Sequence, residues 1–382
     1  MTIAAIRLYH LVAPLPEVIG NALVFFDRRE TLLVEIRDRA GRSGWGECWQ
    51  APAAARAIIE SRLAGLLLGQ DAQAITRHWH ALLNAAGTDR GGPALIAVAG
   101  LDIALHDLAA RQQGVPLSTL LGGRIRDRIP AYASGPFFKP GGHPYRDFER
   151  DAETYLRAGF RAIKLRSGFD PADDAATALA VRRLMGEEGT LMLDFNQSYA
   201  PRAALAAARR MEEARLLWIE EPSIPDDLAG YRMLAPQLTP ALAGGETFGS
   251  ASAFLPFLEA GCLDVLQPDI ALCGGLTGTK RVAMLGEIFE RPVVPHVWGG
   301  IVNFQAALHF TATLPAIRSG ARLGAYPFLE FDAGPNPLLD LCGRPRLNAD
   351  GTVSVPDAPG LGIELKPETF AGFVQAHSAM EA

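Results

Sequence analysis

After residue 124 the sequence alternates between two patterns of hydrophobic and polar residues. Short β-forming runs are followed by alanine-rich stretches in which apolar residues recur at helical spacing. The predicted strands are residues 129–134, 162–166, 190–195, 216–220, 241–246, 265–267, 293–296 and 321–326, and helical stretches between them include 171–185, 201–213, 250–260 and 276–289. Repeated eight times, this alternation predicts an α/β protein built as a parallel TIM barrel. A doubly wound open sheet is the alternative, but no Gly-x-Gly-x-x-Gly turn follows an early strand.

The first part of the chain has the pattern of a smaller α+β unit. Residues 31–36 are β-rich, and a polar turn separates them from a second strand-like run at 45–49. Between residues 94 and 113 the apolar residues recur at helical spacing. The final stretch, 350–382, is rich in proline and glycine, and we expect it to pack back on the amino-terminal unit.

Composition and charge narrow the class of protein. Hydrophobic residues make up 49% of the 382 residues, enough for a large domain with a smaller partner. The formal net charge of −6 is spread without long like-sign runs, which argues against nucleic acid as a main partner. The four cysteines lack Cys-x-x-Cys spacing, no apolar run approaches a membrane span, and the first residues do not resemble a signal peptide. We therefore expect a cytoplasmic protein with no membrane partner.

Three acidic residues follow the apolar cores of three successive predicted strands. Asp194, Glu220 and Glu246 are each 26 residues from the next, which is about the length of one strand, one helix and two loops. The three carboxylates should therefore lie at one level, at the mouth of the barrel. Such carboxylates repel one another unless a cation neutralises them, and oxygen ligands without cysteine or clustered histidine predict Mg²⁺. A single acid in this place more often caps the next helix, but three in even register favour the metal site.

Two basic residues lie on the second predicted strand of the barrel. Lys164 and Arg166 are two positions apart, so both side chains should point to one face, into the barrel mouth. Cations there would neutralise a substrate carboxylate, and a solvated edge strand is the alternative. By the same alternation, Glu221 should point away from Glu220, which leaves Glu220 as the metal ligand.

A further polar pair ends the sixth and seventh predicted strands. Asp269 and His296 come from neighbouring strands, so the carboxylate can hold the imidazole in one tautomer and raise its basicity. We predict a catalytic pair rather than a structural histidine. Glu330 follows the last predicted strand, and buried near the metal it would stay protonated and donate a hydrogen bond to a substrate oxygen.

In this order the motifs resemble those of the enolase superfamily, specifically its mandelate racemase subgroup. The likeness covers nearly the whole chain, and the order of the motifs is highly specific although each motif alone is modest. The matching segments are Ala104-Leu105-His106-Asp107-Leu108-Ala109-Ala110, Lys164-Leu165-Arg166, Asp194-Phe195-Asn196, Trp218-Ile219-Glu220-Glu221-Pro222, Gly244-Gly245-Glu246, Gln267-Pro268-Asp269 and Pro295-His296-Val297-Trp298-Gly299. Residues 26–29 and 295–299 look most like the branch that acts on sugar acids, which includes galactarolactone cycloisomerase.

The resemblance implies a modified barrel of (β/α)7β type with an α+β capping domain. The capping domain would comprise residues 1–125 and about 350–382, and the catalytic barrel residues 126–349. The family forms an enolate intermediate stabilised by Mg²⁺ and is expected to assemble as a homo-oligomer. The implied Mg²⁺ ligands are Asp194, Glu220 and Glu246.

The resemblance also implies roles for other residues. His296 would act as acid or base with Asp269, and Lys164 would assist the substrate carboxylate. Substrate choice in this family depends on the cap, so the loop 15–21 and the segment 49–51 are expected to set specificity. The predicted substrate-binding residues are Asn21, Trp49, Asn196 and Trp298.

One position departs from the family pattern. The usual motif is Lys-x-Lys, whose second lysine is a base on the face opposite the histidine, and here that position is Arg166. A guanidinium stays protonated in nearly any protein setting, whereas racemisation must remove a proton from one face and return it on the other. Arg166 therefore favours dehydration of a sugar acid to a 2-keto-3-deoxy acid, with His296 removing the alpha proton.

Other functions stay open at this point. A sugar-acid lactone cycloisomerase or a racemase/epimerase is the alternative within the same chemistry, since a desolvated Arg166 can also act as a base. More distant alternatives are a non-catalytic sugar-acid binding protein and a lyase that forms a Schiff base with Lys164. In each case the expected partner is a small carboxylate, either a sugar acid or its lactone.

Overall fold

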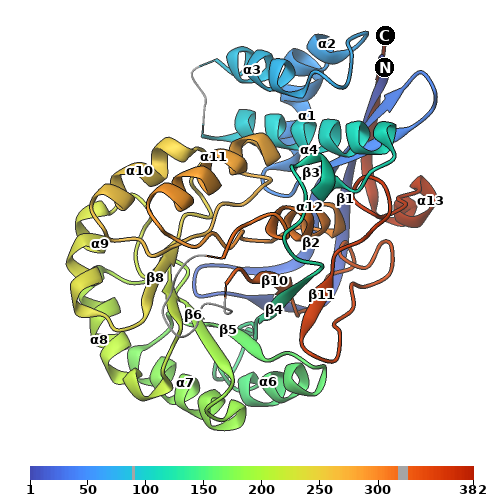
Figure 1. Ribbon diagram of the computed structural model, residues 1–382. Coiled ribbons are helices and arrows are strands. Elements are labelled where there is room, and N and C mark those ends of the chain that lie inside the picture. Colours follow the sequence, from blue (N-terminus) through green and yellow to red (C-terminus); the bar gives the residue numbers. More distant parts are fainter. Residues whose placement is uncertain (88–90, 317–325) are drawn as a thin grey trace.

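The computed structural model of the protein describes residues 1–87, 91–316 and 326–382. A curled parallel sheet has its strands in the order β10-β4-β5-β6-β7-β8-β9, and an antiparallel sheet has the order β12-β1-β2-β3. Helices cover the outside of the curled sheet, and further helices lie beside the antiparallel sheet at the other end of the molecule (Figure 1). This is the predicted architecture of a barrel-like α/β unit with an α+β cap.

Side chains alternate along each parallel strand between the inside of the sheet and the layer of helices. Ile163 and Leu165 join the core beneath the helices, whereas Ala162 belongs to a separate cluster on the inner face with the large rings of Tyr132 and Trp218. The inner face is therefore filled by side chains and is not a channel. The strands are β4 (Arg128–Ser134), β5 (Ala162–Arg166), β6 (Thr190–Asp194), β7 (Trp218–Glu220), β8 (Ala241–Gly244), β9 (Val265–Leu266) and β10 (Leu329–Asp332), with β11 (Thr352–Ser354) antiparallel to β4.

Among the described residues, one helix follows each strand from β4 to β9, and α12 follows residues 293–296. The predicted helix at 171–185 coincides with α7, and the other three predicted helices differ from the observed ones only at their ends. The helices are α6 (Phe148–Arg157), α7 (Pro171–Met185), α8 (Pro201–Arg210), α9 (Leu228–Leu234), α10 (Ala251–Glu259), α11 (Gly275–Ile288) and α12 (Ile301–Thr311).

The last two predicted strands differ from the structure. Residues 293–296 meet the 265–269 segment only through isolated bridges, because Pro292 and Pro295 lack the N–H groups that a continuous ladder requires. The predicted strand at 321–326 lies outside the described residues except for its last residue. The parallel sheet is instead extended at β10, which pairs with β4.

The antiparallel sheet joins segments from both ends of the sequence. β12 pairs with β1 from Ala5↔Glu381 to Leu11↔Val374, so the final residues complete a sheet that the first residues begin. The predicted hairpin forms between β2 and β3. The elements of this part are β1 (Ile3–Gly20), β2 (Phe25–Asp38), β3 (Ser43–Cys48), β12 (Val374–Glu381), α1 (Pro52–Ile58), a π-helical turn (Ile59–Leu63), α2 (Ala64–Leu67), α3 (Ile75–Ala85), α4 (Pro93–Gln113), α5 (Leu117–Leu120) and α13 (Pro367–Phe370).

Helix α4 packs against β3 of this sheet and forms its core. By length and composition it could span a membrane, so the expectation that no apolar run approaches that length was wrong. In the structure 94% of its most apolar window is buried inside the protein. A helix that is apolar on all sides and enclosed by protein is a core helix.

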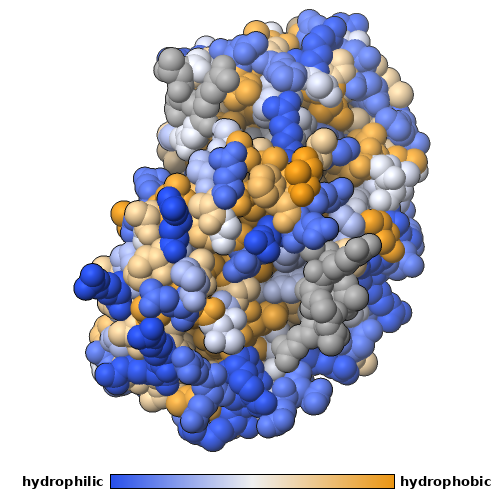
Figure 2. Space-filling model, turned by 60° about the vertical axis from the view of Figure 1, so that its left-hand side comes forward, coloured by the Kyte–Doolittle hydropathy of each residue, from blue (hydrophilic) through white to orange (hydrophobic). Residues whose placement is uncertain are grey.

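The outer surface is mixed in hydropathy. Figure 2 shows hydrophilic residues over most of the lower end of the molecule and hydrophobic residues among them across the middle. Helix α11 contributes two exposed apolar side chains, Met284 and Ile288, which are 57% and 72% exposed. Single exposed apolar residues are common on monomeric proteins, so the surface does not define an assembly.

The packing of β3 on α4 depends on glycine, because a Cβ atom at Gly46 would lie 1.8 Å from the carbonyl oxygen of Gly100. Gly46→Ala must push the helix away from the sheet, and we expect it to lower the free energy of unfolding by about 3 kcal/mol. Urea denaturation measures this loss. Gly65→Ala is the control, since Gly65 is an exposed residue of α2 and a Cβ atom there would have no neighbour within 4 Å, and it should stabilise by about 0.5 kcal/mol. Equal effects of the two substitutions would contradict the close approach.

Candidate active site

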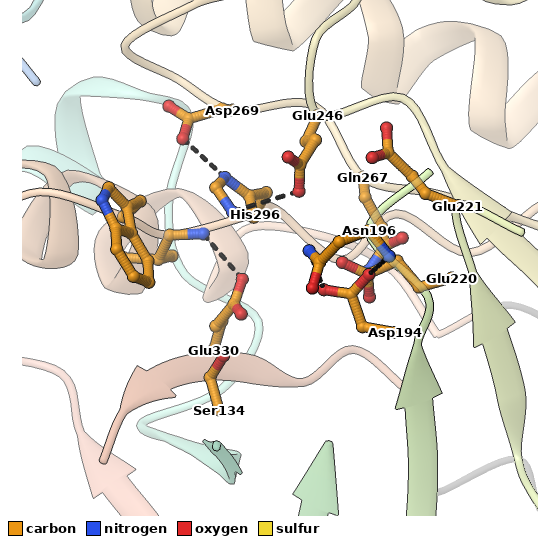
Figure 3. A network of polar contacts seen from close by, with 12 residues as sticks. Ser134, Asp194, Asn196, Glu220, Glu221, Glu246, Gln267, Asp269, His296 and Glu330 are labelled. Atoms are coloured by element: carbon orange, nitrogen blue, oxygen red, sulfur yellow. Dashed lines mark hydrogen bonds and ion pairs between the residues drawn. The ribbon is translucent and has the colours of Figure 1, made fainter. Parts of the chain in front are cut away.

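The polar residues of the parallel sheet gather at the carboxyl ends of its strands (Figure 3). Asp194 and Glu220 are the last residues of β6 and β7 and are register partners, so they lie at one level, as their spacing predicts. Glu246 follows the end of β8 by two residues. The side chains of Asp194 and Glu220 are almost fully buried, and that of Glu246 is 18% exposed.

Lys164 lies among these carboxylates. Its Nζ is 2.6 Å from Glu220 Oε1, 2.9 Å from Glu330 Oε1 and 3.5 Å from Asp194 Oδ2. Burial alone would lower the pKa of Lys164, but Glu220 and Glu330 raise it well above its ordinary value. The buried amine is therefore an ammonium ion, and it neutralises part of the negative charge at the strand ends.

His296 contacts two acids through its two ring nitrogens. Nδ1 is 2.7 Å from Asp269 Oδ2, and Nε2 is 3.2 Å from Glu246 Oε2. Burial alone would lower the pKa of His296, but Glu246, Glu330 and Asp269 raise it to about 10. Asp269 thus fixes the imidazole by Nδ1 and leaves Nε2 directed toward the acid-lined end of the sheet (Figure 3).

The carboxylates raise one another's pKa because they are buried together. Burial raises the pKa of Glu220 to about 7 against the opposing effect of Lys164, and Asp194, Glu330 and Glu246 add to the rise. Burial likewise raises the pKa of Glu246, with His296 opposing and Asp194 contributing. This crowding means that the acids favour a further positive charge between them.

Neutral donors orient the first two acids. Gln267 Nε2 and Trp218 Nε1 donate to Glu220 Oε2 at 2.6 and 3.2 Å. Asn196 donates its backbone N–H to Asp194 Oδ1 at 2.8 Å and its Nδ2 to Oδ2 at 2.9 Å. Asn196, predicted to bind substrate, therefore holds Asp194, and its own Oδ1 is buried without a hydrogen-bond partner.

Glu221 differs from the sequence-based expectation. Its backbone has a φ of 39°, in the left-handed region, which takes the side chain out of the strand alternation. Burial and the neighbouring Glu246 and Asp194 raise its pKa well above the ordinary value. Glu221 thus belongs to the same acid cluster, and the prediction that it points to the opposite face was wrong (Figure 3).

Glu330 also differs from expectation, since it lies within β10 rather than after the last strand. Its Oε2 accepts a hydrogen bond from Val297 N at 2.9 Å. Burial alone would raise the pKa of Glu330, but Lys164 and His296 lower it to about 2. Glu330 therefore accepts a hydrogen bond and faces the Lys164 ammonium, and its predicted hydrogen bond to a substrate oxygen stays a prediction.

Arg166 lies beside Asp194 and two aromatic rings. Its Nη1 is 3.5 Å from Asp194 Oδ2, and its Nη2 donates to Ser134 Oγ at 3.2 Å. The guanidinium carbon is 4.6 Å from the ring centroid of Phe137 and 5.4 Å from that of Trp298. Lys164 and Arg166 thus share the inner face, as their two-residue spacing predicts.

Arg29 reaches the same aromatic group from β2 of the antiparallel sheet. Its Nη2 is 2.7 Å from Asp332 Oδ2, and its guanidinium carbon is 3.9 Å from the ring centroid of Trp298. Burial, and then Arg166, lower the pKa of Arg29, while Asp332 opposes the change. This buried ion pair joins the cap to the end of β10.

Two residues predicted to bind substrate make other contacts. Asn21 Oδ1 accepts hydrogen bonds from the backbone N–H groups of Leu23 and Val24 at 2.9 and 3.0 Å, so it shapes the turn between β1 and β2. Trp49 Nε1 donates to Asp269 Oδ2 at 3.0 Å. The predicted contacts of Asn21, Trp49 and Trp298 with substrate stay predictions.

Two family profiles match this sequence. Residues 147–369 match the description "Enolase C-terminal domain-like", and residues 12–122 match "Mandelate racemase / muconate lactonizing enzyme, N-terminal domain". The chain belongs to the enolase superfamily. The acid-lined strand ends and the histidine–aspartate pair lie within the first of these matches.

Relatives in the enolase superfamily are similar over most of the chain. The D-galactarolactone cycloisomerase of Agrobacterium fabrum is 36% identical over 98% of this chain and 99% of its own. The 3,6-anhydro-alpha-L-galactonate cycloisomerase of Streptomyces coelicolor is 33% identical over 88% and 89%. A racemase structure from Streptomyces coelicolor with bound magnesium has a TM-score of 0.86 and 30% identity, covering 97% of this chain and 99% of that one. Sugar-acid dehydratases are also among the relatives.

The donor set suits the magnesium found in that superfamily structure. Asp194, Glu220 and Glu246 offer carboxylate oxygens, and Asn196 Oδ1 is a buried oxygen without a partner. Within the described residues, no three His, Cys, Asp or Glu side chains are grouped closely enough to hold a metal as they stand. The reason is that Lys164 takes up Asp194 and Glu220, whereas Glu246 turns to His296. The chemistry of the residues fits Mg²⁺, and rotation of these side chains would be needed to bind it.

Sequence reasoning missed three buried contributors to this enolase-superfamily site. Arg29 anchors the cap to β10, and Asn303 Nδ2 is 3.3 Å from Asp269 Oδ1. Glu47, fully buried, accepts hydrogen bonds at the start of α12. The signal that could have revealed Glu47 is an acid between two tryptophans in the apolar run at 45–49, where burial requires a partner.

Removing one member of the buried Arg29–Asp332 pair should destabilise the protein. Arg29→Met keeps much of the side-chain volume but leaves the buried Asp332 carboxylate with only the neutral donors Asn336 and Gly334, and we expect a loss of about 3 kcal/mol in the free energy of unfolding. The neighbouring Arg28→Met is the control, since Arg28 is 57% exposed, and its effect should stay within about 0.5 kcal/mol. Urea unfolding compares the two, and equal losses would show that the buried pair is not the cause.

Proposed function

We propose that this enolase-superfamily enzyme removes the proton alpha to the carboxylate of a sugar acid and eliminates the 3-hydroxyl group, giving a 2-keto-3-deoxy acid. The observation that carries the proposal is the pair formed by His296 and Asp269 beside the acid-lined strand ends. A fixed imidazole with one nitrogen directed toward the substrate region is suited to move a proton. The sugar-acid dehydratases among the relatives support this assignment.

In this proposal each charged residue has a separate task. His296 takes the alpha proton at Nε2, and Asp269 holds the imidazolium that forms. The imidazolium then gives a proton to the 3-hydroxyl group, which leaves as water, and the enol takes up a solvent proton at C3 to become the 2-keto-3-deoxy acid. Lys164 offers its ammonium to the substrate carboxylate. The Arg166 guanidinium adds positive charge on the inner face, and a guanidinium is a poor base, so proton return on a second face, which a racemase needs, is not favoured.

Asp194, Glu220 and Glu246 would hold Mg²⁺, which when bound supplies positive charge that makes the alpha proton more acidic. Asn196 and Gln267 keep the carboxylates of Asp194 and Glu220 oriented through their amide donors. In this proposal Glu246 would serve as a ligand of the cation rather than as the partner of His296, and Nε2 would accept the proton.

A second candidate is a lactone cycloisomerase. The full-length likeness to D-galactarolactone cycloisomerase favours it. The early step is the same, because the alpha proton again leaves to His296. The leaving group is then the ring oxygen of the lactone rather than a free hydroxyl, so no water is released.

His296→Asn should abolish turnover while sparing ligand binding. Loss of the proton acceptor should lower kcat by about 10³-fold, measured by keto-acid formation, and calorimetry should still detect binding of a sugar acid. His80→Asn is the control, because His80 is an exposed residue of α3, and it should keep wild-type kcat. Turnover that survives His296→Asn would contradict the assigned role, and binding without turnover in the wild type would support a non-catalytic binder.

The product formed in D2O separates the candidate reactions. Incubated with Mg²⁺ and a panel of aldonic and aldaric acids, the protein should give a 2-keto-3-deoxy acid with deuterium at C3, seen by NMR. Activity should disappear after chelation and return with Mg²⁺. Deuterium at C2 of unreacted acid would identify an epimerase, and turnover confined to lactones would identify a cycloisomerase. Turnover that persists after thorough chelation would overturn the metal assignment.

The remaining sequence-based expectations become part of this proposal. The substrate is a small carboxylate, and the protein acts in the cytoplasm as a homo-oligomer without nucleic acid or membrane partners. The cap is assigned to residues 1–125 and about 350–382, and the catalytic barrel to 126–349. The relatives support the choice of a sugar acid or its lactone as substrate.

A further inference from the structure

Asp269, which holds the catalytic imidazole, is itself held by several donors. His296 Nδ1 and Trp49 Nε1 share its Oδ2 at 2.7 and 3.0 Å. Ala271 N and Asn303 Nδ2 donate to its Oδ1 at 2.7 and 3.3 Å. Asp269 is 0% exposed, so these groups take the place of water and set the plane of the carboxylate.

The indole donor comes from the cap, whereas the other donors come from the barrel side. Trp49 directly follows β3 and lies 220 residues before Asp269 in the sequence. Its ring centroid is 6.1 Å from that of His296. Gly299 permits this contact, because a Cβ atom there would lie 2.8 Å from Trp49 Cβ and its φ is 94°. The segment that carries His296 thus passes directly against the end of β3.

Glu47, a residue of β3 itself, holds the other end of the same segment. Glu47 Oε1 accepts from Gly300 N at 2.5 Å, and Oε2 accepts from Asn303 N at 2.9 Å, at the first turn of α12. Thr31 Oγ1 also donates to Glu47, at 2.9 Å. A carboxylate at a helix N-terminus stabilises that turn. Glu47 therefore fixes the backbone of Asn303, whose side chain reaches Asp269.

We infer that β3 positions the proton-transfer pair, with Trp49 as the positioning residue for Asp269 and Glu47 as the anchor of α12. This inference rests on the proposed function, and it assigns Trp49 a task other than substrate contact. The indole N–H is already engaged by Asp269, so only the ring face is left for a ligand. Removal of that N–H leaves His296 Nδ1 as the one donor on Oδ2 among the residues that the structure describes, and the carboxylate and the imidazole lose a fixed mutual orientation.

Trp49→Phe tests the inference because it removes the N–H and keeps an aromatic ring. We expect kcat to fall about 10- to 100-fold with KM nearly unchanged. Trp45→Phe is the matched control, since Trp45 lies on β3 but packs against Tyr9 and Phe370, away from the pair. It should keep the wild-type kcat. An increase in KM at unchanged kcat would overturn the positioning role in favour of substrate contact.

A second measurement does not depend on any substrate. In protein labelled with ¹⁵N-histidine, the His296 Nδ1–H resonance, assigned by its loss in His296→Asn, should shift in Trp49→Phe and not in Trp45→Phe. A shifted resonance without turnover on any sugar acid would leave the inference standing and refute the proposed reaction. An unshifted resonance in a folded Trp49→Phe protein would refute the inference, whatever the activity.

Discussion

The main constraint on this structure is the burial of several carboxylates at the carboxyl ends of neighbouring strands. Asp194, Glu220, Glu221 and Glu330 are almost fully buried there, and Glu246 is largely so. Lys164 and Arg166 supply the nearest fixed positive charge from β5. Since carboxylates in a poorly solvated place repel one another, the arrangement calls for a cation that the side chains do not provide. In the proposed reaction, the cation that would neutralise the carboxylates would also make the alpha proton of the substrate more acidic.

The fold places this charge where it can be tolerated and used. The inner face of the parallel sheet is apolar at its lower level, with Trp218 and Met192 in one cluster, and polar two residues further along the same strands. Strand alternation alone thus produces a packed layer beneath a reactive one. The cap contributes from the open side, since Arg29 and Trp49 reach residues that follow the barrel strands. Neither sheet therefore forms the site without the other.

Periodicity explains what the sequence predicts well. The spacing of Asp194 and Glu220 and the two-residue step from Lys164 to Arg166 follow from regular strands, and both are found. The sequence-based predictions were wrong at positions where the backbone departs from regular strand geometry. Glu221 has a left-handed φ that no strand rule anticipates, and prolines break the ladder at 293–296. The role of Glu47 was missed because two of its donors, Gly300 and Asn303, lie more than 250 residues away at the start of α12, so local sequence spacing does not reveal them.

The pairing of β12 with β1 has a consequence for biosynthesis. Residues 3–20 leave the ribosome long before residues 374–381, so one edge of the amino-terminal sheet stays unpaired while the whole barrel is being translated. An unpaired strand edge is a template for association with other chains. Nascent chains therefore pass through a stage in which the edge of β1 is unpaired, and loss of β12 by proteolysis would expose the same edge again.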